Sequence, residues 1–132
     1  MRLARVSPRY MRAVQLLVLR DFATEPDVWD KIDKNESFVM IQHRTPKVLG
    51  CLLVDTQKSL AYLVVRDGFR GRGIGSELMK KCTATDLTCV STLIPFYQRF
   101  GFQQLSTLDD GRIIMRRDQT FTTVHSDGIK NG

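Results

Sequence analysis

The sequence predicts a mixed α/β fold of the α+β kind, with a mostly antiparallel central sheet, helices on both faces and one locally parallel pair of strands. Three observations lead to this expectation. Apolar residues recur at helical spacing over residues 8–22 and then form the short apolar runs of strands over residues 37–65. The turns between those runs are short enough for antiparallel hairpins. A strand, a glycine-rich turn, a helix and another strand then follow, and that order requires neighbouring parallel strands.

The first half of the chain is expected to contain a strand, two helices and a three-stranded meander. Ser7 followed by Pro8 is typical of a helix start. The second helix is shorter and has Pro26 near its beginning. The expected elements are a strand at 2–6, helices at 8–22 and 25–34, and strands at 37–43, 48–56 and 60–65.

The second half returns to alternating helices and strands. Gly101 is expected to end a segment of one or two helical turns, because glycine is typical of helix ends. We expect one domain over residues 1–117 and a polar tail over residues 118–132. The expected elements are helices at 75–86 and 95–102 and strands at 87–93, 102–107 and 111–118.

The composition narrows the class of protein. A length of 132 residues suggests a single hydrophobic core, and the net charge of +6 favours an anionic partner. We do not expect nucleic acid to be the partner, because only the charge suggests it and no aromatic RNA-binding motif or zinc spacing accompanies it. No apolar run is long enough to span a membrane and no signal peptide is evident, so we expect a cytoplasmic protein. Cys51, Cys82 and Cys89 lack the CxxC spacing, so we expect buried free thiols and no metal site.

The densest chemical signal is the turn that follows the strand at 60–65. Glycines at every second position alternate with arginines immediately before a helix. Glycine lets backbone N–H groups approach a ligand, and a helix start adds unpaired N–H groups, so the turn is suited to a phosphate or pyrophosphate. A glycine-rich turn without a ligand is the alternative. The residues concerned are Arg70, Gly71, Arg72, Gly73 and Gly75.

Two common phosphate-binding motifs do not fit this turn. A P-loop that begins at Gly68 would have Gly73 in place, but Ile74 stands where lysine is required. A dinucleotide fingerprint would need its third glycine at Ser76.

Two stretches together resemble the GNAT superfamily of N-acetyltransferases. Residues 70–75 resemble its R/Q-x-x-G-x-G/A signature. The later stretch PFYQRFGFQQL is similar to its F-Y-x-x-x-G-F segment, with Phe96, Tyr97, Gly101 and Phe102 in place. The two motifs occur in the family's order, with the expected elements between them.

The resemblance, which covers roughly residues 1–117, implies an enzyme that uses acetyl-CoA as donor. It implies direct attack by a neutral amine on the thioester, with Tyr97 protonating the departing thiolate. A backbone N–H of the strand ending at Val65 would stabilise the developing negative charge. The implied cofactor contacts are the pantetheine arm along Leu63, Val64 and Val65, and the pyrophosphate beside Arg70, Gly71, Arg72, Gly73, Ile74, Gly75 and Ser76.

The sequence departs from the family pattern in two places that bear on catalysis. Many members have a cofactor-contacting asparagine where Val90 stands, and Ser91 or Thr92 could replace it. Many also have a glutamate on the strand at 60–65, which here holds no carboxylate. The polar residues near that strand are Tyr62, His43 and Asp55.

Three functions therefore stay open at this stage. The leading one is acetyl transfer to a primary amine of a small molecule or a protein, and a homodimer is compatible with it. The second is a non-catalytic CoA-binding regulator, and the third is a small nucleic-acid-binding protein.

The acceptor of the leading function is not evident from the sequence. The two N-terminal helices, which usually wall the acceptor site, carry several acids beside Trp29. These acids either form a solvated face or attract a cationic acceptor. They are Asp21, Glu25, Asp27, Asp30 and Asp33.

Overall fold

A computed structural model describes residues 1–44 and 47–118. Seven strands form one sheet in the order β1-β2-β3-β4-β5-β7-β6. All neighbouring pairs are antiparallel except β4 and β5, which are parallel, as the strand–helix–strand order predicted. The strands are β1 (Arg2–Arg5), β2 (Phe38–Gln42), β3 (Lys47–Val54), β4 (Ser59–Val65), β5 (Asp86–Cys89), β6 (Gln103–Thr107) and β7 (Ile113–Arg116).

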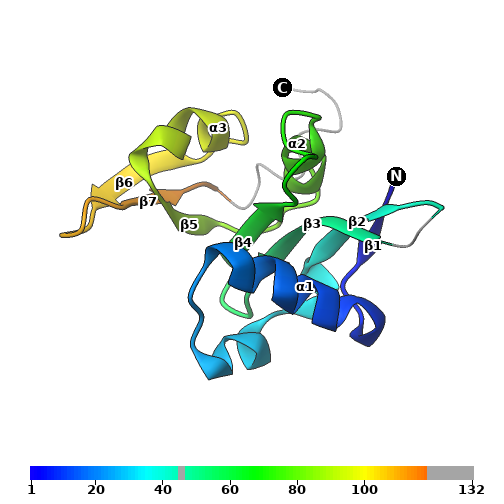
Figure 1. The fold of residues 1–132 in the computed structure, drawn as a ribbon. Coiled ribbons are helices and arrows are strands. Elements are labelled where there is room, and N and C mark those ends of the chain that lie inside the picture. Colours follow the sequence, from blue (N-terminus) through cyan, green and yellow to red (C-terminus); the bar gives the residue numbers. More distant parts are fainter. Residues whose placement is uncertain (45–46, 119–132) are drawn as a thin grey trace.

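Helices cover both faces of the sheet, as expected (Figure 1). The helix α1 lies on one face, while α2 and α3 lie on the other. The α-helices are α1 (Pro8–Asp21), α2 (Ile74–Met79) and α3 (Ile94–Gln98), and the 3₁₀ helices are η1 (Pro26–Lys31), η2 (Lys34–Glu36) and η3 (Ser91–Leu93).

The core is divided by the sheet into two apolar layers. On one side, Val14, Leu17 and Val18 of α1 are buried in a layer with side chains from β2, β3 and β4. On the other side, side chains of α2 and α3 form a larger layer with the opposite face of the same strands. Since strand side chains alternate between faces, each of the central strands contributes to both layers.

Most strand and helix ends lie within two residues of the sequence-based expectation. The helix α3 ends at Gln98, four residues before the end expected for it, and three further elements differ. The helix expected at 25–34 is replaced by the 3₁₀ helices η1 and η2, because the backbone between them is extended. There, Ile32 forms a bridge to Asp55, and the N–H of Asp33 donates to the carbonyl of Val54 at 2.8 Å. The strand expected at 87–93 ends at Cys89, where η3 soon follows.

The third difference is α2, which ends at Met79 although a helix was expected over 75–86. The guanidinium of Arg117 donates to the carbonyls of Cys82 at 2.6 Å and Ala84 at 2.9 Å. If the helix ran to residue 86, the Cys82 carbonyl would accept a bond from the N–H of Asp86. Here it accepts from Arg117, so a residue far along the chain helps to hold this segment outside the helix.

A bulge in β4 coincides with the point where β4 and β5 part. The register of β3 with β4 leaves Ala61 as an extra residue. Pairing between β4 and β5 stops at Leu60, so the rest of β4 has no neighbour on that side. Because a bulge increases the local twist of a strand, it accounts for β5 turning away from β4 (Figure 1).

Three remaining expectations concern the whole chain. Within the described residues, no helix is long and apolar enough to cross a bilayer. Cys51, Cys82 and Cys89 are buried free cysteines, as expected. Apart from Asp118, the tail expected at 118–132 lies outside the described residues.

Candidate active site

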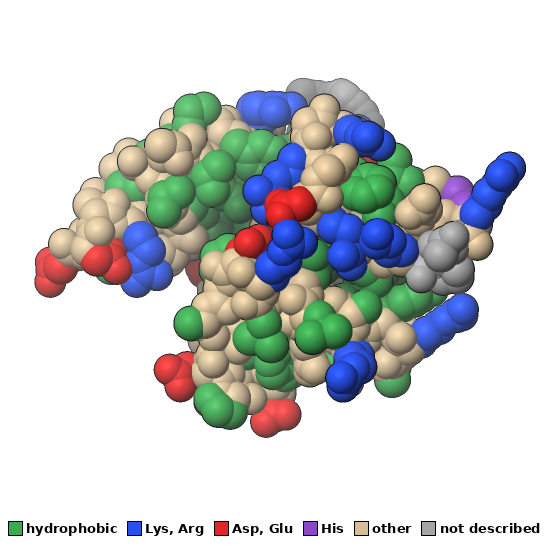
Figure 2. All heavy atoms as spheres, in the orientation of Figure 1, with side chains coloured by type: hydrophobic (Ala, Val, Ile, Leu, Met, Phe, Trp, Pro, Cys, Tyr) green, Lys and Arg blue, Asp and Glu red, His purple; other side chains and the backbone are tan. Residues whose placement is uncertain are grey.

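A cavity of about 590 Å³ opens where β4 has lost its neighbour, on the face covered by α2 and α3. Its walls are the free part of β4, the glycine-rich turn and the start of α2, the helix α3, and the end of α1. Figure 2 shows a hollow with hydrophobic side chains inside and charged side chains gathered at its rim. The lining residues include Leu63, Val64, Val65, Arg70, Gly71, Gly73, Ile74, Gly75, Ser76, Phe96 and Tyr97.

The glycine-rich turn depends on backbone conformations that favour glycine. Gly71 and Gly73 have φ angles of +79° and +82°. A Cβ atom added to either would meet no heavy atom within 4 Å, so the space beside both glycines is open. Gly73 also precedes the first residue of α2. The turn thus presents bare backbone to the cavity.

The N–H groups of this turn are available to a ligand. Among the described residues, the backbone nitrogens of Gly71, Gly73, Ile74, Gly75 and Ser76 donate no hydrogen bond. All five residues line the cavity. Because unpaired N–H groups near a helix start favour anions, this arrangement fits the phosphate-binding role that the sequence predicted.

The free edge of β4 supplies a second set of backbone groups. In an antiparallel ladder, alternate residues direct their N–H and C=O groups away from the partner strand. Beyond Leu60, those of β4 face the cavity and not β5. An extended ligand could therefore pair with β4 in the place that a strand would occupy.

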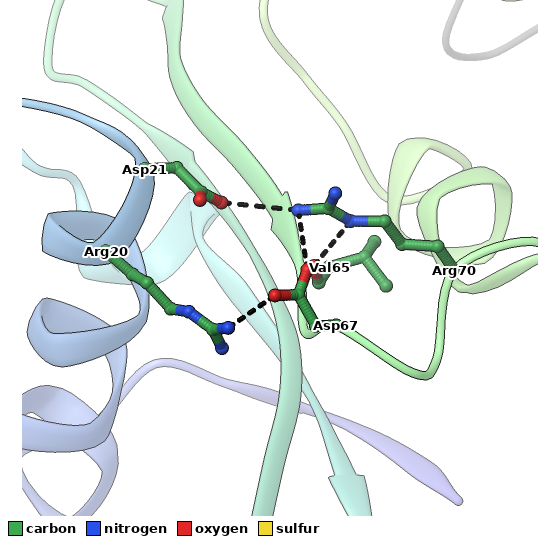
Figure 3. A network of polar contacts seen from close by, with 5 residues as sticks. All are labelled: Arg20, Asp21, Val65, Asp67 and Arg70. Carbon is green, nitrogen blue, oxygen red and sulfur yellow. Dashed lines mark hydrogen bonds and ion pairs between the residues drawn. The ribbon is translucent and has the colours of Figure 1, made fainter.

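Arg70 is engaged with the protein in this structure. Its Nε donates to the carbonyl of Val65 at 3.1 Å, and its guanidinium lies 3.3 Å from the carboxylate of Asp21 and 3.4 Å from that of Asp67. Arg20 forms an ion pair with the other oxygen of Asp67. Figure 3 shows these side chains converging from α1 and the turn.

This network ties the turn to α1 and to the end of β4. Its arginines also neutralise two carboxylates at a rim where an anion would enter. A direct bond from Arg70 to a phosphate stays a prediction. Arg72 is not in the lining itself, but its guanidinium lies 5.1 Å from the centre of the ring of Phe69, which does line the cavity. A bond from Arg72 to a phosphate likewise stays a prediction.

Tyr97 is a buried residue in the lining of the cavity. Only 7% of its surface is exposed, and its ring meets the edges of Phe96 and Phe102 at centroid distances of 5.0 and 6.2 Å. Burial raises the pKa of Tyr97 to about 12. The phenol therefore keeps its proton at neutral pH and has that proton to donate.

A second cavity, of about 580 Å³, is lined by β4, β5 and the residues that follow α1. It shares Phe22, Leu63, Leu93 and Tyr97 with the first cavity. Two molecules that enter the two cavities would thus meet beside Leu63 and Tyr97, where the two strands part.

The second cavity contains polar groups that the sequence did not single out. Asp86 lines it, and the hydroxyl of Ser59 donates to one oxygen of the Asp86 carboxylate. Arg112, from the turn between β6 and β7, is also in the lining. Asp86 was missed because it fell at the end of an expected helix, whereas it begins β5. Its place before the alternating pattern Leu87-Thr88-Cys89 is the signal that could have indicated a strand start.

The family of the chain follows from comparison with known sequences. A family model described as an acetyltransferase (GNAT) domain matches residues 34–104, which is more than half of the chain. The chain belongs to the GNAT acetyltransferase family. It is therefore an acyltransferase by family, and the resemblance noted in the sequence is confirmed. No curated protein gives a significant match to the sequence.

Solved GNAT structures share its fold. Naa50 from Arabidopsis thaliana, solved with the bisubstrate analogue CoA-Ac-MVNAL, has a TM-score of 0.73 at 15% identity, over 89% of this chain and 97% of that one. The ribosomal-protein-S18-alanine N-acetyltransferase of Escherichia coli has a TM-score of 0.63 at 15% identity, over 86% and 90%. Escherichia coli ElaA has a TM-score of 0.62 at 20% identity, over 89% and 97%.

The residues that depart from the GNAT pattern lie in or near the second cavity. Val90 lines it, whereas Ser91 and Thr92 belong to η3 and are exposed outside both cavities. Tyr62 lines it too, with its ring 5.3 Å from that of Phe22. His43 and Asp55, the other polar residues considered for this GNAT chain, line neither cavity. Asp55 instead holds the β3–β4 turn, because its carboxylate accepts from the N–H groups of Gln57 and Ser59.

Most of the acids of the N-terminal helices lie outside the two cavities or are paired with other residues. Asp21 lines the first cavity and pairs with Arg70. Asp27 pairs with Lys31 at 3.2 Å, and Asp33 accepts from the N–H of Asn35. With Glu25 and Asp30 also outside both linings, the placement favours the solvated face over an acceptor wall. Trp29 lies near the second cavity without lining it, since its ring stacks 6.3 Å from that of Tyr62.

Proposed function

We propose that this protein transfers an acetyl group from acetyl-CoA to a primary amine. The observation that carries the proposal is the meeting of the two cavities beside Tyr97, where β4 and β5 part. A transferase must bring its two substrates to one point from different sides. Two cavities that share Leu63 and Tyr97 would allow a donor and an acceptor to meet in this way. The solved relatives support the choice of reactants, because Naa50 was crystallised with a CoA-peptide analogue and the Escherichia coli relative is described as an alanine N-acetyltransferase.

The first cavity is the proposed site of acetyl-CoA, which supplies an activated thioester when bound. The open N–H groups from Gly71 to Ser76 would hold its pyrophosphate, and the free edge of β4 from Leu63 to Val65 would pair with its pantetheine arm. The fit rests on bare backbone that a single Cβ would obstruct.

We also propose that residues 1–117 form the catalytic domain.

The second cavity is the proposed site of the acceptor amine. A neutral amine there would attack the thioester directly, and a backbone N–H of β4 would stabilise the charge that develops on the carbonyl oxygen. Tyr97 would donate its proton to the departing sulfur. Because the surroundings that raise the pKa of Tyr97 are apolar, they also make a sulfur anion more basic than in water, which favours this transfer.

The experiment that tests this function measures CoA release with a panel of amines. The panel contains the peptide Met-Val-Asn-Ala-Leu, a lysine-containing peptide with a blocked N-terminus, and small primary amines. We expect saturable CoA release with at least one of them and a higher melting temperature in acetyl-CoA, because a ligand that binds only the folded state stabilises it.

A non-catalytic CoA-binding regulator is the second candidate, and one observation favours it: Val90 lines the second cavity at the position where many members have asparagine. That function predicts the same rise in melting temperature and no CoA release with any amine. No effect of acetyl-CoA on melting would contradict both functions.

A further inference from the structure

Asp86 is placed on the acceptor side of the proposed reaction. Leu87 and Cys89 are buried in the apolar layer on the α2 and α3 face. Since side chains alternate along a strand, Asp86 and Thr88 face the α1 side. The second cavity reaches both faces of the sheet beside β5, and Asp86 and Thr88 line it together with Leu87 and Cys89. Among the described residues, Asp86 is the one carboxylate in the lining of that cavity.

The Asp86 carboxylate is oriented by a neighbour that is itself fixed. The hydroxyl of Ser59 donates to its Oδ1 across the parallel strand pair. Ser59 is in turn held by Asp55, whose carboxylate accepts from the Ser59 N–H at 3.0 Å and whose N–H donates to the Ser59 carbonyl at 2.9 Å. The Oδ2 of Asp86 accepts no hydrogen bond from the described residues, so it is open to a ligand.

The other titratable groups around Asp86 are poor proton acceptors. Arg112 is a cation paired with Asp110 at 2.8 Å, and Arg116 is the register partner of Asp86 on β7. Burial raises the pKa values of Tyr62 and Cys89, and that of Tyr97 to about 12, so these groups are neutral at pH 7. A carboxylate is thus the one basic group that this cavity offers.

We propose that Asp86 is the general base of this enzyme and that Ser59 positions it. The inference rests on the proposed amine acetyltransferase function. It places the base on β5, although many family members carry it on β4. Ser59, the register partner of Asp86, precedes Leu63 by four residues on β4, which is roughly 13 Å at about 3.3 Å per residue. Because Leu63 lies where the two cavities meet, the proton travels from that point to Asp86 through water in the cavity.

The proposed step is balanced as follows. One proton passes from the acceptor ammonium through water to Asp86, which leaves a neutral amine. The C–N bond forms as the C–S bond breaks, and the second amine proton leaves through the same water as the amide forms. Tyr97 donates its proton to the departing sulfur and regains one from solvent. The net result is one amide, one CoA thiol and one released proton.

The test compares Asp86→Asn with wild type, using the panel amine that gives the fastest wild-type turnover. We expect kcat/KM for the amine to fall by about 10²-fold or more at pH 7. The deficit should shrink as the pH approaches the pKa of the amine itself, because the amine then loses its proton without a base. The KM for acetyl-CoA should stay within about twofold of wild type.

Three further variants sharpen the comparison. Asp27→Asn makes the same chemical change on an exposed carboxylate outside both cavities and should behave as wild type. Ser59→Ala should cause a smaller loss of kcat/KM with the same pH dependence, because it removes the hydrogen bond that orients the Asp86 carboxylate but keeps the carboxylate itself. Asp86→Glu keeps a carboxylate and should recover part of the activity, which also covers the case in which Asp86→Asn does not fold.

Two results would overturn the role of Asp86 alone. One is wild-type activity of Asp86→Asn at pH 7. The other is a purely structural pattern, which is a loss of equal size at every pH together with no recovery in Asp86→Glu. Failure of the wild type to acetylate any amine would instead overturn the proposed function on which this inference rests.

Discussion

Tyr97 is the residue whose hydroxyl should protonate the departing sulfur. Its hydroxyl group is the one feature that Tyr97→Phe removes, while the ring contacts with Phe96 and Phe102 remain. We expect this change to lower kcat by about 10²–10⁴-fold, the usual contribution of a general acid. The KM for acetyl-CoA should hardly change, as steady-state kinetics can show.

Tyr10→Phe is the matched control for this prediction. The Tyr10 hydroxyl accepts a hydrogen bond from Arg2 at 3.4 Å, and Tyr10 lines neither cavity. Full activity of a folded Tyr97→Phe protein would reduce Tyr97 to a packing role.

A substitution at Gly73 tests the proposed phosphate site through a single residue. Gly73→Ala puts a Cβ into open space beside the unpaired N–H groups and forces an L residue to a φ of +82°. We expect the melting shift caused by acetyl-CoA to shrink markedly, because the methyl group occupies the place of the phosphate. Differential scanning fluorimetry over a range of acetyl-CoA concentrations measures it.

Gly111 offers a control with the same backbone strain. It has a φ of +89°, its added Cβ would also meet nothing within 4 Å, and it lies outside both cavities. Both alanine variants should lose stability by about 1–2 kcal/mol. An equal ligand response in the two variants would place the phosphate away from Gly73.

At the scale of elements, the site depends on how closely α2 packs against the sheet. A Cβ added to Gly50 of β3 would lie 3.0 Å from the carbonyl oxygen of Val64, 3.1 Å from Cγ2 of Ile74 and 3.3 Å from Cδ1 of Leu78. Gly50→Ala therefore pushes α2 and β4 away from β3. We expect a loss of about 1–3 kcal/mol in the free energy of unfolding, measured by urea denaturation.

The same substitution should also affect the cofactor site, because α2 and β4 form two of its walls. We expect the KM for acetyl-CoA to rise in Gly50→Ala, while Gly111→Ala, which touches neither element, leaves it unchanged. A destabilised Gly50→Ala protein with an unaltered KM would show that the glycine-rich turn is positioned without α2. The Arg70 network with Asp21, Asp67 and Val65 would then be the element that holds it.

At the scale of the whole molecule, buried weak acids should make the fold sensitive to alkaline pH. Burial raises the pKa of the fully buried Cys51 thiol from 9.0 to about 12 and that of Tyr97 from 10.0 to about 12. The folded state therefore holds protons that the unfolded chain releases above about pH 9. These two groups should leave stability unchanged below about pH 9 and lower it as the pH rises toward 12, Cys51 from about pH 9 and Tyr97 from about pH 10, at about 1.4 kcal/mol per pH unit for each group.

Urea denaturation between pH 8 and pH 10.5 measures this dependence. Cys51→Ala removes one of the groups, so its stability should fall less steeply with pH than that of wild type. Identical slopes for the two proteins would show that Cys51 is not protonated more strongly in the folded state than in the unfolded one.

The sequence by itself determined the order of elements, the parallel strand pair and the glycine-rich turn. Each of these depends on local patterns: apolar spacing, turn length and the backbone freedom of glycine. Tyr97 was identified by its place in a short motif, and the structure brings it to the cavity that the turn also lines. Local chemistry of this kind is readable because neighbouring residues largely set it.

Only the tertiary structure decided which distant residues share a site. Ser59 and Asp86 are joined by strand pairing, and the parting of β4 from β5 depends on a bulge that no residue pattern marks. Side chains from remote segments also form the network around Arg70. In the same way, Arg117 donates to the carbonyl of Cys82 just beyond the end of α2. Such contacts form only once the sheet is assembled, because pairing energy between strands, and not the propensity of any one segment, brings those groups together.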